Sequence, residues 1–214
     1  MFSTFFKQIS LAKKLAFTAV FLALSVVANS FIDIDITPNN KITFTYLICF
    51  FAAYLLGGLP AFVIGFVGDA IGFLIKPSGV YWLFGLTLGI FALLAGIILH
   101  YLPIKGKAAP YIKTGIALVV CYVAITLVLN SIINYYYVKI FLYGGEYSKT
   151  FWVYLGGRIG IQSAIYAINV GVIFALLPLI ERLPAFFGKK KSSAKEESTH
   201  TENPQSGEDN PNQN

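Results

Sequence analysis

A series of long apolar segments, each bounded by a short polar stretch, most constrains what this chain can fold into. A helix needs about 20 mostly apolar residues to cross the hydrocarbon core of a bilayer. Charged residues make up only 12% of the 214 residues, about half the share of an ordinary soluble domain. The pattern therefore predicts an all-α membrane protein, a bundle of six transmembrane helices. The predicted spans are Leu11–Asn29, Ile42–Leu56, Ala61–Ile75, Tyr81–Tyr101, Ile112–Tyr135 and Gly157–Ile180.

Two of these segments, Ile42–Leu56 and Ala61–Ile75, are shorter than a bilayer requires, and only Gly-Gly-Leu-Pro separates them. We expect both helices to extend into their flanks. Backbone that is not helical is tolerated at membrane depth only where protein or a water-filled cavity covers it.

The composition changes abruptly after Leu183-Pro184. Residues 185–214 contain few apolar side chains and are rich in Ser, Glu, Asn and Pro. Such a segment cannot bury enough apolar surface to offset the entropy that ordering would cost. We therefore predict a transmembrane domain over residues 1–184 and a disordered polar cytoplasmic tail over residues 185–214.

The basic residues indicate the orientation of the chain in the membrane. Eleven of the 16 Lys and Arg residues fall on one side of a six-span arrangement, and five fall on the other. An excess of Lys and Arg marks the cytoplasmic side, so both termini are predicted to be cytoplasmic. Because these residues flank apolar segments and form no basic groove, the net charge of +6 indicates membrane topology and no nucleic-acid partner. The eleven are Lys7, Lys13, Lys14, Lys105, Lys107, Lys113, Arg182, Lys189, Lys190, Lys191 and Lys195.

The sequence lacks the motifs that most often indicate catalysis. No segment fits the phosphate-binding pattern G-x-x-x-x-G-K-[ST], and the two histidines, His100 and His200, stand alone. We expect no metal site, no cofactor and no catalytic constellation, so an enzyme is the weaker functional class.

Asp69 is a carboxylate inside the third predicted span. An ionisable group at membrane depth is costly and faces the bundle interior, usually with a partner. One interpretation is a proton, cation or ligand site. The other is a structural pairing that fixes the turn between the third and fourth spans, because glycines at positions 65, 68 and 72 indicate a close helix contact here.

A polar stripe opens the sixth predicted span. Its four members recur at helical spacing and share one face of an otherwise apolar helix. An arginine near the outer end can bind a carboxylate with two hydrogen bonds, although it can also extend to the interface. The deeper amides favour a stripe that lines a cavity. The four residues are Arg158, Gln162, Tyr166 and Asn169.

The predicted external loops are rich in aromatic residues and glycine. Loop one, Asn29–Lys41, alternates apolar and acidic residues, which favours a short extended segment across the bundle. Loop three contains a Lys-Pro-Ser-Gly turn followed by Tyr81 and Trp82, and loop five, Tyr135–Gly156, contains three consecutive tyrosines. These loops are candidates for a lid over a ligand, while the alternative is an aromatic belt at the membrane interface.

Small residues recur four positions apart in several spans, which lets helix backbones approach closely within one chain or between chains. Pairs of this kind are Gly68 with Gly72, Gly85 with Gly89 and Gly156 with Gly160. Internal packing is the default interpretation. The first span is the best candidate for a face that docks a partner. Its small residues are Ala12, Ala16, Ala19 and Ala23.

Together these motifs resemble the S components of energy-coupling factor (ECF) vitamin transporters, most closely the folate-specific S components. The resemblance covers Leu11 to about Leu183 and depends on four features. They are the alanine-rich first span, Gly68–Leu74, the loop from Pro77 to Thr87, and the Arg158-x-x-x-Gln162 pair. The folate-specific proteins commonly have a second proline where this chain has Leu83-Phe84.

The resemblance implies a substrate-binding subunit of a prokaryotic cell membrane, without activity of its own. Its partners would be a vitamin, a transmembrane coupling (T) subunit and two ATP-binding cassette subunits. It further implies that loop three is both a hairpin and part of the lid, and that Ala19 and Ala23 belong to the docking face. The candidate ligand contacts are Ser78, Gly79, Tyr81, Trp82, Arg158, Gln162, Tyr166 and Asn169.

Folate is the predicted vitamin, and three alternatives stay open. Pantothenate, hydroxymethylpyrimidine or a queuosine precursor could replace it. The chain could be a stand-alone secondary carrier that uses Asp69 for coupling, or an assembly protein without a ligand.

Overall fold

The computed structural model describes residues 2–32, 34–37, 40–42, 44–77, 80–81 and 83–188. Three of the predicted ligand contacts, Ser78, Gly79 and Trp82, lie outside the described residues. Residues 189–214, which make up most of the predicted tail, also lie outside them.

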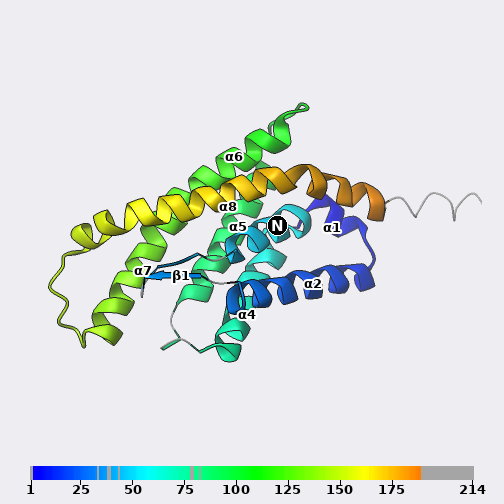
Figure 1. The fold of residues 1–214 in the computed structure, drawn as a ribbon. Coiled ribbons are helices and arrows are strands. Elements are labelled where there is room, and N and C mark those ends of the chain that lie inside the picture. The colour runs from blue at the N-terminus through cyan, green and yellow to red at the C-terminus, as the bar shows by residue number, and fades with distance from the viewer. Residues whose placement is uncertain are drawn as a thin grey trace, which may run out of the picture.

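The described chain is helical apart from one small hairpin (Figure 1). The π-helical stretch η1 joins α6 to α7, and a second one, η2, extends α7, so that one continuous helical segment covers Ala109–Leu142. The elements are α1 Thr4–Gln8, α2 Leu11–Ser30, β1 Ile34–Thr37, β2 Asn40–Ile42, α3 Thr45–Leu56, α4 Gly58–Ile75, α5 Phe84–Tyr101, α6 Ala109–Cys121, η1 Tyr122–Leu129, α7 Asn130–Tyr137, η2 Val138–Leu142 and α8 Phe151–Gly188.

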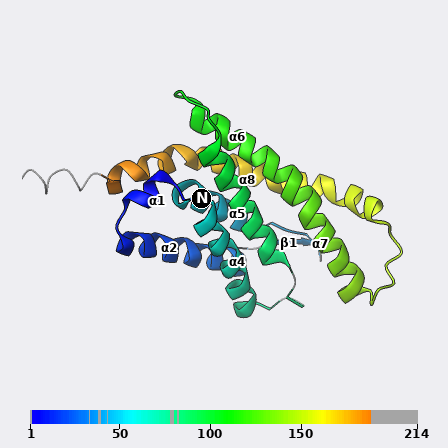
Figure 2. The ribbon, with the colours of Figure 1, turned by 180° about the vertical axis from the view of Figure 1, so that it is seen from behind.

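The predicted six-helix membrane bundle is confirmed. Five helical segments of the described chain are long and apolar enough to cross a membrane, and α3 is a shorter apolar helix. Helices α2 and α8 run across one side of the bundle, while α4, α5 and α6–α7 stand more steeply behind them (Figures 1 and 2). The C-terminal part of α8 lies beside α1, so both ends of the described chain are at the same end of the bundle.

Helix α3 is shorter than predicted, and it does not extend into its flanks. Its 12 residues span about 18 Å, well short of the hydrocarbon core. Protein covers this helix almost completely, and other elements bond to its last carbonyl groups. The Ser3 backbone N–H donates to the Leu56 carbonyl at 3.1 Å, and the Ser3 hydroxyl donates to Leu55. The His100 Nε2 lies 3.0 Å from the Ala53 carbonyl. With these groups satisfied, the short helix is tolerated at membrane depth.

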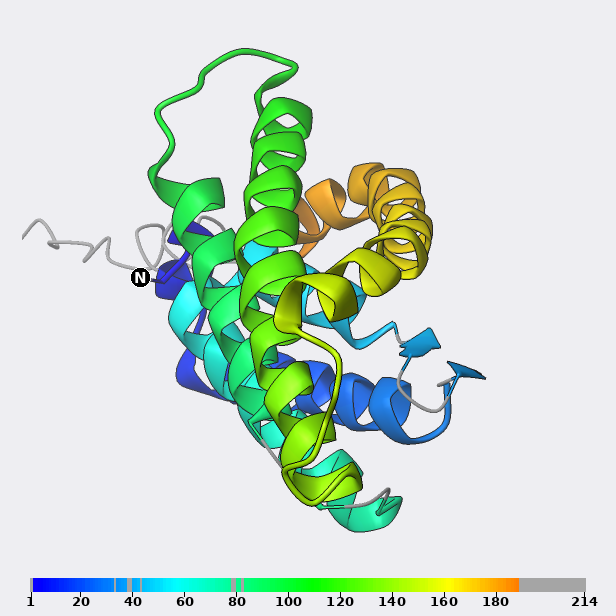
Figure 3. The same ribbon diagram turned by 90° about the vertical axis from the view of Figure 1, so that its left-hand side faces the viewer.

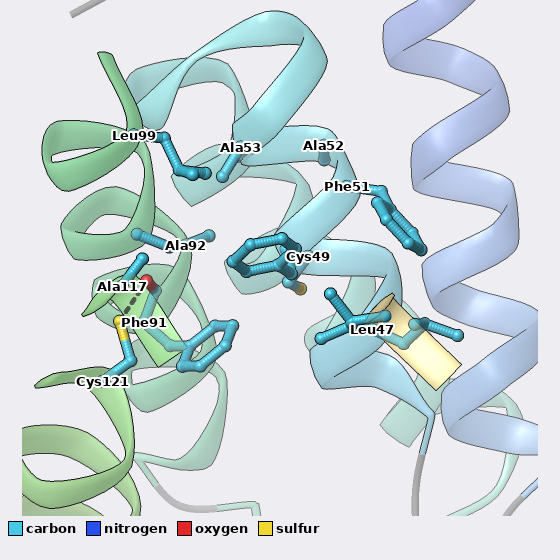
Figure 4. Close-up of a cluster of buried hydrophobic side chains, with 14 of the residues drawn as sticks. Leu47, Cys49, Phe51, Ala52, Ala53, Phe91, Ala92, Leu99, Ala117 and Cys121 are labelled. Carbon is cyan, nitrogen blue, oxygen red and sulfur yellow. Dashed lines mark hydrogen bonds between the residues drawn. The ribbon is translucent and has the colours of Figure 1, made fainter. Parts of the chain in front are cut away.

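The core centres on side chains of α3, α5 and α6 (Figure 4), and α2, α4, η1 and α8 add further residues to it. Phe50 and Phe91 are completely buried, and the Cys121 thiol donates to the Phe91 carbonyl at a sulfur–oxygen distance of 3.8 Å. Two close helix approaches frame this core. A Cβ at Gly96 would overlap the backbone of Gly58, and a Cβ at Gly68 would overlap the Ser25 side chain. The predicted internal packing of glycine pairs is correct for α4 and α5, because a Cβ at Gly72 would overlap the Asn29 side chain and one at Gly89 the Phe62 ring.

Loop one forms an antiparallel hairpin, in agreement with the predicted extended segment. Strand β1 pairs with β2, with Asp35 opposite Lys41 in the register. Strand β2 contacts α8, and Figure 3 shows the hairpin at the edge of the bundle, beyond the end of α2.

The last two spans are longer than predicted. The fifth continues to Leu142, although its three tyrosines and Lys139 suggest an earlier end at the membrane interface. The tyrosines lie in α7, and π-helical turns precede and follow this helix. Helix α8 begins at Phe151 and ends at Gly188, and it contains Pro178 and Pro184 in its interior.

Candidate ligand-binding site

The polar stripe of α8 faces the interior of the bundle. Arg158, Gln162, Tyr166 and Asn169 are all buried, and the exposed fraction of Arg158 is only 6%. Glycines on the opposite face, such as Gly156 and Gly160, are exposed. The alternative that Arg158 extends to the membrane interface is therefore wrong, and its guanidinium group lies inside the protein.

Arg158 is held by a hydrogen-bonded chain that crosses from α8 to α7. Its Nη1 donates to the Tyr154 hydroxyl at 3.1 Å, and this hydroxyl donates in turn to the Asn134 Oδ1. The Arg158 Nε is buried without a hydrogen-bond partner. Among the described side chains, Arg158 forms no ion pair with a carboxylate. A buried guanidinium is costly unless it is paired, so this group is the strongest indication of a ligand.

Tyr46 brings α3 and α5 to the same region. Its hydroxyl accepts a hydrogen bond from the Asn130 amide at 3.3 Å and shares another with the Thr87 hydroxyl. Asn130 lies one helical turn before Asn134, so Tyr46 lies on the same side of α7 as the Tyr154–Arg158 chain. The Tyr46 ring packs edge-on against Phe91 at a centroid distance of 5.0 Å.

Four helices thus contribute to one group of buried or partly buried polar side chains, which we call the polar cluster. It combines two tyrosine hydroxyls, one threonine hydroxyl, two amides and one guanidinium. Such a mixture can hydrogen-bond both the polar edge of a planar ring and an anionic group. The cluster consists of Tyr46, Thr87, Asn130, Asn134, Tyr154 and Arg158.

The deeper part of the stripe makes one contact between helices and one within α8. The Tyr166 hydroxyl donates to the Leu118 carbonyl at 2.8 Å, and its ring packs against Tyr122 at 4.7 Å. The Asn169 amide donates to the Ile165 carbonyl at 3.2 Å. Tyr166 and Asn169 therefore lie further along α8 than the arginine of the polar cluster. Their predicted role as ligand contacts stays a prediction.

Aromatic side chains gather beside the polar cluster at the start of α8. The Tyr135 ring packs edge-on against Tyr147, Phe151 and Tyr154, with centroids 5.8, 5.6 and 5.5 Å away. Trp152 points outward and is 76% exposed. Loop five therefore contributes both an ordered aromatic group next to Tyr154 and residues at the surface.

Asp69 has two partners, which favours the structural interpretation of this carboxylate. The Asn29 amide of α2 donates to the Asp69 Oδ1 at 3.1 Å and to its backbone carbonyl at 3.4 Å. The Tyr81 hydroxyl also hydrogen-bonds the Asp69 carboxylate. Partial burial and the Asp69 carboxylate raise the pKa of Tyr81 to about 12. This Asn29–Asp69–Tyr81 clasp joins α2, α4 and loop three through the Tyr81 hydroxyl, and the predicted ligand contact of Tyr81 stays a prediction.

The alanines of the first span point away from the bundle. Ala12, Ala16, Ala19 and Ala23 are all exposed, so the default interpretation of internal packing is wrong for this helix. It is also wrong for the Gly156 and Gly160 pair of α8, because nothing lies within 4 Å of a Cβ built at either position.

Sequence reasoning missed most members of the polar cluster. Asn130 and Asn134 are four residues apart in an apolar span, which is the same signal that identified Arg158 and Gln162. Tyr154 lies four residues before Arg158 and extends the stripe by one turn. A search for polar residues four apart would have found these three. Tyr46 stands alone in its span, and no local pattern indicates it.

Comparisons with known proteins agree with this architecture. The model of a family described as ECF-type riboflavin transporter, S component, matches residues 10–180. A crystal structure of FolT bound with folic acid superimposes with a TM-score of 0.59 at 20% identity, over 77% of this chain and 92% of that one. The structure of the S component of a bacterial ECF transporter gives a TM-score of 0.56 at 18% identity, over 83% and 98%. No curated protein sequence matches the chain.

Proposed function

The chain belongs to the family of ECF-type riboflavin transporter S components, and we propose that the vitamin it captures for import across the cell membrane is folate. It is a multi-pass membrane protein and an S component of a vitamin transporter, and it is not an enzyme. The identity of the vitamin is the part that we propose. The observation that carries it is the buried Arg158 guanidinium, whose Nε has no partner.

The chemistry of Arg158 favours an anionic vitamin. Folate ends in a glutamate with two carboxylates, whereas riboflavin carries no ionised group at neutral pH. A carboxylate can accept two hydrogen bonds from a guanidinium and neutralise its charge. Among the other vitamins considered, pantothenate also has a carboxylate, but it lacks a planar ring. The tyrosines of the polar cluster suit a ring that both stacks and hydrogen-bonds.

The energy for import has to come from other chains, because the sequence contains no P-loop. We propose that a transmembrane coupling subunit docks on the exposed alanine face of α2 and that two ATP-binding cassette subunits drive it. Small exposed side chains allow the close backbone approach of a partner helix. Both termini are proposed to lie in the cytoplasm, on the side with more Lys and Arg.

Titration of Arg158→Ala with folate tests the choice of vitamin. Removing one member of a buried charge pair costs 2 kcal/mol or more, so we expect the affinity to fall about 30-fold or further. The matched control is Arg182→Ala, because Arg182 lies on the same helix but is exposed. Unchanged affinity in Arg158→Ala would remove this arginine from the site.

The binding profile of the unmodified protein separates the alternatives. Tight riboflavin binding without folate binding would reassign the vitamin and keep the S-component function. Uptake by this chain alone, sensitive to an uncoupler and to Asp69→Asn, would instead favour the secondary carrier.

Docking is tested by Ala19→Trp in cells that contain the whole transporter. We expect uptake to fall by at least about tenfold while folate binding by the purified subunit stays intact, because the indole would hold a partner helix away. Val119→Trp is the control, since Val119 is also exposed but lies on α6. Full uptake with Ala19→Trp would exclude this face as the interface.

A further inference from the structure

We propose that Tyr154 and Asn134 are positioning residues that hold the Arg158 guanidinium for an anionic group. Through this arginine they would set the preference for a charged over an uncharged ligand. The inference rests on the proposed function, because it assigns the binding of the ligand's anionic end to these three side chains. Neither Tyr154 nor Asn134 belongs to the residues predicted from the sequence pattern.

The Tyr154 hydroxyl has a defined direction in this arrangement. A phenol has one proton to donate, and here it goes to the Asn134 Oδ1. The oxygen is then left to accept from the Arg158 Nη1 at 3.1 Å. Because Asn134 takes the only phenol proton, Tyr154 acts towards Arg158 as a pure acceptor. The arginine is therefore held by a neutral group that does not cancel its charge.

The chain uses only part of the arginine's capacity to donate hydrogen bonds. A guanidinium has five N–H donors in a rigid fork, and the contact with Tyr154 uses one on Nη1. The Nε remains buried and without a partner. A carboxylate of the ligand can therefore bind the unused donors while Tyr154 keeps the group in place.

The ring of Tyr154 is itself held by its neighbours. Tyr135 packs edge-on against it with the centroids 5.5 Å apart, and Tyr147 does so at 6.3 Å. The Arg158 guanidinium carbon lies 6.0 Å from the centroid of the Tyr154 ring. Because the supporting side chains are already ordered, less conformational entropy is lost when a ligand binds.

Helix α7 supports both sides of the polar cluster. Asn130 donates to Tyr46 of α3, and Asn134, one turn later, accepts from Tyr154 of α8. The two amides lie on one face of α7, because their spacing is four residues. Charge selectivity thus depends on how the fifth span is placed relative to the sixth as well as on Arg158 itself.

Two probes, one with a charged end and one with an uncharged end, test the inference. They are folate and its dimethyl ester, in which both glutamate carboxylates are blocked. For Tyr154→Phe, which removes only the hydroxyl, we expect the affinity for folate to fall about tenfold and that for the ester to stay within about twofold. Asn134→Ala should reduce the ratio of the affinity for folate to the affinity for the ester (the folate-to-ester ratio) by a smaller factor than Tyr154→Phe does. The double variant should lose no more affinity for folate than Tyr154→Phe alone, because Tyr154 and Asn134 act through one chain of hydrogen bonds.

Tyr135→Phe is the matched control. It removes a hydroxyl from the same aromatic group, but this hydroxyl donates to the Lys149 carbonyl at 3.0 Å and does not contact Arg158. Its folate-to-ester ratio should equal that of the unmodified protein. Thermal unfolding of each variant in detergent checks that the fold is retained.

Each remaining outcome identifies what has failed. If Tyr154→Phe weakens folate and ester equally, the hydroxyl only supports the local structure and the inference is overturned. An unchanged ratio in that variant overturns it as well. If the unmodified protein binds folate no more tightly than its ester, Arg158 does not recognise the anionic end. If it binds no folate at all, the proposed function fails, and this inference fails with it.

Discussion

The two halves of the bundle use glycine in opposite ways. In the N-terminal half, α2 to α5, glycines such as Gly65, Gly68 and Gly96 lie where another helix leaves no room for a Cβ. In the C-terminal half, Gly156, Gly160 and Gly171 have nothing within 4 Å of such a Cβ. The first half is thus a closely packed scaffold, while the second presents small residues to its surroundings and contains two π-helical stretches.

The polar cluster lies at the seam between these halves. Tyr46 and Thr87 come from the closely packed half, whereas Asn130 and Arg158 come from the other. The Asn130–Tyr46 hydrogen bond crosses this seam.

The largest difference between the halves should appear when a methyl group is added to Gly96. In Gly96→Ala the new Cβ meets the Gly58 backbone, which cannot turn aside as a side chain can. We expect a loss of about 3 kcal/mol of stability, measured as a lower unfolding temperature and a lower yield of folded protein in detergent. A variant as stable as the unmodified protein would contradict the close packing of α4 on α5.

The Asn29–Asp69–Tyr81 clasp should have an intermediate effect. Asp69→Ala leaves the Asn29 amide and the Tyr81 hydroxyl without their common acceptor. Such unpaired groups cost about 2 kcal/mol of stability, which thermal unfolding in detergent would measure. Asp69→Asn is the control, because it keeps the shape and one acceptor oxygen and should lose less. Equal losses in both variants would mean that the charge matters more than the hydrogen bonds.

The smallest effect should come from the glycines of α8. Gly160→Ala adds a methyl group in open space and replaces a poor helix former with a good one. We expect a gain of up to about 1 kcal/mol in stability and no change in the affinity for folate. Reduced uptake in the whole transporter together with unchanged folate binding would instead indicate that this face also contacts a partner.

Local patterns predicted much of the fold and part of the candidate site. The start of α2 at Leu11 and the end of α4 at Ile75 agree with the apolar segments of the sequence. The burial of Arg158 and Gln162 followed from their spacing in an apolar helix. The short α3 was not predictable, because the Ser3 contacts that satisfy its carbonyl groups come from 52 residues earlier in the chain.

The sequence by itself determined that this is a bundle of membrane helices, because a bilayer accepts only long apolar segments whose backbone groups bond internally. It also determined that Asp69 faces inward, because a charge at membrane depth is too costly to face lipid, whereas for Arg158 it left a position at the interface open. Only the tertiary structure decided their partners. Asn29 lies 40 residues from Asp69, and Asn134 lies 20 residues from Tyr154. Pairs so far apart in sequence meet only through helix packing, because no local periodicity relates their positions.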